Sequence, residues 1–167
     1  CDALSSYKTM EEKLEILKDS HAGAFAILMG CCYFVLDYGV FHAVDLRAIR
    51  LLAIGYVLSR AFSGLAIVVF KKARKSGLAA TFSDSAQKKT VAVTMILYII
   101  VCAVLMVLTD PVIGSLCFLT ALLVFGWYRY MSYQKFGGIT GDLAGFFLQV
   151  CELAMAFVTV IAIHLIG

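Results

Sequence analysis

Five long apolar runs alternate with short polar segments along the chain. The runs are Ala24 to Val40, Ile49 to Phe70, Val91 to Leu108, Val112 to Tyr128, and Leu143 to Ile166. Each run has about the 17–25 residues that a helix needs to cross a bilayer. Lipid offers no hydrogen-bond partner to free backbone groups, so such segments cross as helices. The pattern predicts an all-α integral membrane bundle of about five transmembrane helices.

A shorter amphipathic segment, residues 9–20, precedes the first run. Acidic side chains recur at every fourth residue and leucines lie on another face, which is the pattern of an amphipathic helix. Thr9 and Glu12 have the spacing of a capping box at its start. We expect this helix to lie along the cytoplasmic interface, within a cytoplasmic or interfacial segment that covers residues 1–23.

Composition agrees with a membrane protein. Apolar residues make up 62% of the chain and charged residues 15%, and the mean hydropathy is +0.94, against about half apolar in ordinary soluble domains. We therefore expect membrane lipid as a partner and no nucleic acid. The length suits a single membrane domain over residues 1–167. The six cysteines lack zinc or redox spacing, and we expect buried free thiols.

Basic residues are distributed unequally between the two sides that five crossings define. Arg47 and Arg50 lie on or near one side, whereas the other side carries eleven basic residues: Lys8, Lys13, Lys18, Lys71, Lys72, Arg74, Lys75, Lys88, Lys89, Arg129 and Lys135. The positive-inside rule makes the second side cytoplasmic. Topology alone accounts for most of these charges.

Two groups of polar residues lie within the apolar runs or directly beside them. Arg60, next to Ser59, comes ten residues before Phe70, roughly 15 Å along a helix. A charge at that depth costs at least about 2.5 kcal/mol, so it should face a partner or a cavity. The second group, at spacings of three and four residues, forms one stripe of the last helix: Asp142, Gly145, Gln149 and Glu152. Such a stripe can bind a divalent cation, pair with Arg60 or relay protons.

A glycine-rich loop, Gly137 to Asp142, precedes the last helix. Gly137, Gly138 and Gly141 expose backbone N–H groups beside a helix N-terminus, an arrangement that suits phosphate. The loop, Arg60 and the stripe are all expected in the cytoplasmic half of the bundle. Together they indicate a protein that handles a phosphorylated cytosolic molecule.

Two long segments resemble one known family. Leu14 to Gly23 reads LEILKDSHAG and resembles the LEIMKDSRxG segment of cobalamin synthase, also called adenosylcobinamide-GDP ribazoletransferase. Gly137 to Leu153 resembles that family's GGQTGDxxGAxxExxEL segment. Ser59 and Arg60 resemble its SR pair, and residues 73–82 resemble its A-R-x-x-G-L-x-x-x-F loop. The order and spacing match along the whole chain.

Several positions depart from the family pattern. The family has an HLDGLADTxDG run, of which this chain shows only the tail, Cys1 to Ala3, with Ala3 in place of glycine. From this we expect the C-terminal part of a longer protein, inactive by itself. His21 replaces an arginine, Ile139 a glutamine and Gln149 a glutamate.

The resemblance implies a Mg2+-dependent phosphotransferase of cobalamin biosynthesis. In that family the adenosylcobinamide phosphoryl group moves from adenosylcobinamide-GDP to alpha-ribazole or its 5'-phosphate, GMP leaves, and adenosylcobalamin or its phosphate forms. The implied location is a bacterial or archaeal cell membrane, multi-pass, with the active face cytoplasmic. Association of copies into a homo-oligomer is left open.

The resemblance also implies roles for individual residues. Asp2 would be a Mg2+ ligand, and the residues expected in catalysis are Asp2, Lys18, Asp19 and Asp142. Those expected to bind substrate are Ser59, Arg60, Arg74, Gly137, Gly138, Thr140, Gly141 and Glu152.

Two rival functions fit some of these features. A transporter or channel would line its pathway with Arg60, Asp142 and Glu152, but the last helix beyond Glu152 is nearly all apolar. A CDP-alcohol phosphotransferase would use a similar aspartate-rich run, and the glycine loop argues against it.

Overall fold

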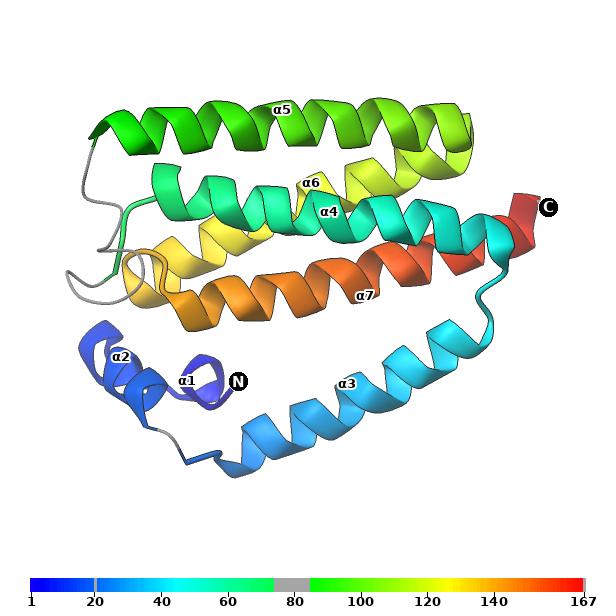
Figure 1. Cartoon of the computed structure of the whole chain (residues 1–167). Helices are drawn as coiled ribbons and strands as arrows, with labels where there is room; N and C mark the ends of the chain where they lie inside the picture. Colours follow the sequence, from blue (N-terminus) through cyan, green and yellow to red (C-terminus); the bar gives the residue numbers. More distant parts are fainter. Residues whose placement is uncertain (20, 74–84, 167) are drawn as a thin grey trace.

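The structure is a computed structural model that describes residues 1–19, 21–73 and 85–166. Seven helices form this part of the chain: α1 (Asp2–Ser5), α2 (Met10–Lys18), α3 (Ala24–His42), α4 (Leu46–Val69), α5 (Ser85–Thr109), α6 (Pro111–Phe136) and α7 (Gly141–Ile166) (Figure 1). Helices α3 to α7 are each long and apolar enough to cross a membrane. The all-α bundle with five spanning helices is therefore confirmed.

Helices α4 to α7 pack together as the body of the protein. Helix α4 contacts α5 and α7, and α6 contacts α5 and α7. Stacked rings fill the centre, with Phe125 against Phe62 and Tyr128 against Phe147. The α5–α6 hairpin is tight, because a Cβ atom built on Gly114 would lie 2.1 Å from the carbonyl oxygen of Met106. A residue without a side chain lets the two backbones meet.

Helix α3 stands apart from this body (Figure 1). Val40 is its only buried residue; it packs near the far end of the helix with Leu52 and Ala156. Cys31 and Cys32 are exposed on α3, whereas Cys102, Cys117 and Cys151 are buried, and all six thiols are free. The expectation of buried thiols is wrong for the α3 pair because this helix packs so little.

The short helices α1 and α2 lie at the end of the bundle where α6 passes into α7 (Figure 1). Ala3 of α1 is buried in the main core, and α2 contacts α6. The predicted capping box of α2 is confirmed: the Thr9 hydroxyl accepts from the Glu12 N–H, and the Glu12 carboxylate accepts from the Thr9 N–H. Two described parts of the chain on which the family resemblance depends, α2 and the start of α7, thus lie at this end.

Candidate functional site

An ion pair joins α4 to α7 within the spanning region. Arg60 Nη1 lies 2.5 Å from Glu152 Oε1, and the Ser59 hydroxyl donates to the same oxygen at 2.7 Å. Arg60 also donates to the carbonyl of Tyr56 and lies over its ring. Of the three interpretations of the α7 stripe, pairing with Arg60 is the one that the structure shows for Glu152. The Arg60 side chain is still 60% exposed, so part of the guanidinium can meet another group.

The rest of the stripe points away from the core. Asp142, Gly145 and Gln149 are exposed, whereas the Glu152 side chain is only 11% exposed. Asp142 and Glu152 lie about 15 Å apart along the helix axis. The two carboxylates of the stripe therefore lie apart: Asp142 is at the end of the helix and Glu152 is at membrane depth.

The glycine loop is built differently from the sequence expectation. Its backbone N–H groups donate within the protein: Gly137 to Tyr133, Gly138 to Ser132, and Ile139 to the carbonyl of Lys71. Gly137 has a φ of +70° and ends α6. The nest of free N–H groups is therefore absent at these three residues. Thr140 follows as a cap, since its hydroxyl accepts from the Leu143 N–H.

The same loop is paired with residues 71–73. Besides the Ile139 bond, the Ala73 N–H donates to the carbonyl of Ile139 at 3.0 Å. A Cβ on Gly138 would lie 2.5 Å from the carbonyl oxygen of Lys71, so glycine is needed for this approach. The pairing brings the backbone of two lysine residues, Lys71 and Lys72, to the start of α7. Sequence reasoning did not foresee it, because the two segments lie far apart in the chain.

Asp2 reaches α3 rather than another carboxylate. Its Oδ2 accepts from the Gly23 N–H and its Oδ1 from the Ala26 N–H, each at 3.0 Å. These donors belong to the first turn of α3.

Lys18 and Asp19 lie at the exposed end of α2. Lys18 pairs with Glu15 at 2.7 Å, and Asp19 accepts from His21. Hydrogen bonds from the His21 backbone, and then from its side chain, hold the pKa of Asp19 below its usual value. Asp19 is therefore ionised at neutral pH but is a weaker base. Arg74 lies outside the described residues.

Mg2+, which the resemblance implies, needs several oxygen ligands. Within residues 1–19, 21–73 and 85–166, no three His, Cys, Asp or Glu side chains are placed to hold a metal ion. Both oxygens of Asp2 already accept backbone hydrogen bonds. The described side chains thus do not make a Mg2+ site among themselves.

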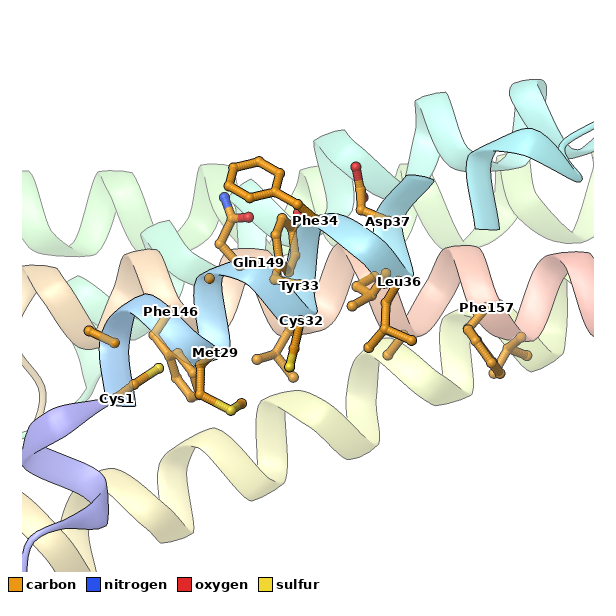
Figure 2. A pocket seen from close by; sticks show the side chains of 16 residues that line it. Cys1, Met29, Cys32, Tyr33, Phe34, Leu36, Asp37, Phe146, Gln149 and Phe157 are labelled. Atoms are coloured by element: carbon orange, nitrogen blue, oxygen red, sulfur yellow. The ribbon is translucent and has the colours of Figure 1, made fainter. Parts of the chain in front are cut away.

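A groove of about 990 Å³ separates α3 from α7. Figure 2 shows Tyr33 and Asp37 on α3 and Gln149 on α7 among its lining side chains, with Cys1 at one end. Asp37 is half-buried and lies within electrostatic range of Tyr33 and Tyr56. Sequence reasoning left Asp37 out of the candidate site, although a carboxylate inside the first apolar run was the available signal.

Comparison with known proteins decides the family. Residues 1–160 match the cobalamin-5-phosphate synthase family. The chain belongs to this family. Relatives of the chain include proteins named adenosylcobinamide-GDP ribazoletransferase from Lachnoclostridium phytofermentans, 47% identical over 161 residues, Geobacillus sp., 31% over 155 residues, and Treponema denticola, 30% over 170 residues.

The matches cover most of this chain but less of each relative. They include 96%, 90% and 92% of the chain, and 62%, 59% and 64% of the three relatives in the same order. The chain thus spans about three fifths of the length of these relatives. No solved structure matches it.

Proposed function

We propose that this chain takes part in catalysing the reaction for which its relatives are named. The adenosylcobinamide phosphoryl group would pass from adenosylcobinamide-GDP to alpha-ribazole or its 5'-phosphate. Membership of the family carries the proposal. The gathering of the family's segments at one end of the bundle supports it, because residues 71–73 meet the loop that opens α7.

The chemistry is a displacement at phosphorus. A ribazole hydroxyl oxygen forms a bond to the phosphorus nearest the cobinamide, and the bond from that phosphorus to the bridging oxygen breaks. GMP leaves with the bridging oxygen, and the hydroxyl proton passes to a base or to water. Catalysis of this kind rests on positioning and on neutralising phosphate charge.

Cations and donors at the start of α7 suit the phosphates in this proposal. Lys71 and Lys72 approach the loop through its backbone pairing, and the first turn of α7 follows Thr140 and Gly141. Arg74 continues the basic segment and is included on the resemblance alone. Asp142, exposed in the first turn of α7, would position the attacking hydroxyl, with Lys18 and Asp19 as further candidates.

Arg60 would serve a different part of the substrate. It lies about 15 Å deeper than Asp142 along the bundle, too far for both to touch one phosphate. A substrate that reaches both places must be long. Adenosylcobinamide-GDP, in which a nucleoside diphosphate is joined to a corrin ring, meets that condition.

The membrane side of the site and its cofactor are further parts of this proposal. The excess of basic residues supports a cytoplasmic location for the α6–α7 loop. Mg2+ is proposed as the cofactor of the complete protein because phosphoryl transfer needs phosphate charge to be neutralised.

Residues 1–167 alone should convert the substrates far more slowly than the complete protein, since the described residues bring together no metal-binding group of three. Lipid is the proposed partner of the exposed surface of α3, and association with a second copy of the chain is the alternative.

A test combines the two substrates with membranes that carry the complete protein. The expected result is adenosylcobalamin and GMP in equal amounts. If membranes with the complete protein form neither product, the proposal is refuted. Uptake of a corrinoid without GMP release would favour the transporter.

A further inference from the structure

Asp2 caps a helix that has no cap of its own. Gly23 is the N-cap residue of α3 and has no side chain to offer. Asp2, which lies 21 residues before Gly23 in the chain, accepts hydrogen bonds from the N–H groups of Gly23 and Ala26 instead. A carboxylate at this place satisfies two free N–H groups and meets the positive end of the helix dipole.

Gly23 makes room for this contact. A Cβ atom built on Gly23 would lie 2.5 Å from Asp2 Oδ1 and 2.7 Å from Asp2 Cγ. The φ of Gly23 is −79°, which any residue adopts, so the backbone conformation does not require glycine. Space for the Asp2 carboxylate is the requirement.

The segment that carries Asp2 is itself fixed. Ala3 is 2% exposed and belongs to the main core, and Leu4 packs against that core. The backbone on the C-terminal side of Asp2 therefore cannot swing freely, and its carboxylate is held toward α3. On the other side of Asp2, Cys1 lines the groove between α3 and α7.

Asp2 thus helps to hold the near end of α3. At its far end Val40 packs against Leu52 and Ala156, and at its near end the first turn donates to Asp2. The groove of about 990 Å³ lies between these points. Losing the Asp2 contact would free the near end of α3 and change the width of the groove.

We propose that Asp2 is a positioning residue that docks the first turn of α3 onto the N-terminal segment and sets the spacing of α3 from α7. This role differs from the one that the resemblance implies for Asp2, a metal ligand. Its consequence for turnover rests on the proposed function, whereas the contact and its effect on α3 do not.

The first test follows amide hydrogen exchange in the full chain in nanodiscs, without Mg2+. Asp2→Ala and Gly23→Ala should each speed exchange at Ala26 by about tenfold, the effect of a lost cap. The double variant should be no worse than either single variant, because both remove one contact. Gly39→Ala is the matched control on the same helix, since a Cβ there meets nothing within 4 Å. Asp2→Asn keeps the size of the side chain and one accepting oxygen, and should give an intermediate rate.

The second test separates positioning from metal binding in the complete protein. Gly23→Ala and Asp2→Ala should lower turnover alike, with the Mg2+ concentration for half-maximal activity unchanged. The proposal is overturned if Gly23→Ala matches Gly39→Ala in exchange, or if Asp2→Ala alone shifts the Mg2+ dependence. If the complete protein has no transferase activity, the exchange experiment still decides the Asp2 contact.

Discussion

Arg60 and Glu152 neutralise each other across α4 and α7 at a depth where neither charge is stable alone. Their atoms Nη1 and Oε1 lie 2.5 Å apart, and Ser59 donates to the same carboxylate oxygen. Glu152 has little exposure and depends on these donors, whereas Arg60 keeps much of its surface open. The pair joins α4 to α7 and leaves part of the Arg60 guanidinium exposed.

Removing one partner should destabilise the bundle more than removing both. Arg60→Ala leaves Glu152 with only Ser59, and Glu152→Gln leaves a bare guanidinium in the membrane. Each should cost about 1–3 kcal/mol, less than a fully buried pair because Arg60 is half open. The double variant should recover part of the loss. Reversible unfolding in mixed micelles measures this, and strictly additive losses would show that the two residues do not interact.

The α5–α6 hairpin gives a stability prediction with an internal control. Gly114→Ala should lower the free energy of unfolding by about 1–3 kcal/mol, because its methyl group would meet the Met106 backbone and the helices would have to part. Gly126→Ala on the same helix should be harmless, since a Cβ there meets nothing within 4 Å. Equal melting temperatures for the two variants would contradict the packing described for α5 and α6.

Several of these features were predictable from the sequence and others were not. Hydropathy fixes the spanning helices because burial in lipid is a local property of each run. The ends were less accurate: α6 continues past Tyr128 to Phe136, and α3 continues past Val40 to His42. In α6 the extra turns carry polar residues that remain helical until Gly137 turns the chain.

The glycine loop shows why site geometry escaped prediction. Gly137, Gly138 and Ile139 have the composition of a phosphate nest, yet their N–H groups donate to Tyr133, Ser132 and Lys71. The Lys71 partner comes from a segment far away in the chain, and no local pattern reports such a pairing. The same holds for Asp2 and Gly23, whose contact depends on how α1 docks.

The acidic residues of α2 provide a pH prediction. A hydrogen bond from the Thr9 backbone, followed by one from its side chain, lowers the pKa of Glu12. A lowered folded pKa means that the stabilisation is present above the usual value and is lost as pH falls through the folded value. Thr9→Ala keeps the backbone hydrogen bond and removes the one from the side chain, so it should raise the pKa of Glu12 part of the way toward its usual range, whereas Thr9→Ser should keep it low. Carboxyl carbon NMR titration measures both, and equal values in the two variants would contradict the capping box.

The distribution of basic residues predicts the membrane orientation. Alkaline phosphatase fused after Ala73 should be inactive, because the proposed orientation puts this fusion on the cytoplasmic side, and the same reporter after Asp110 should be active. Activity in the opposite pattern would invert the bundle and place the α6–α7 loop outside the cytoplasm.

The central claim is that the start of α7, where Asp142 lies, serves the transfer of a phosphoryl group to alpha-ribazole. The most direct measurement is the rate at which membranes with the complete protein form adenosylcobalamin and GMP from adenosylcobinamide-GDP and alpha-ribazole. The wild type should form both, and Asp142→Asn should lower the rate at least about tenfold while the protein still inserts into the membrane. Lys88→Ala, whose charge the topology explains, is the control and should retain the wild-type rate. A wild-type rate in Asp142→Asn, with the control equally active, would contradict the account.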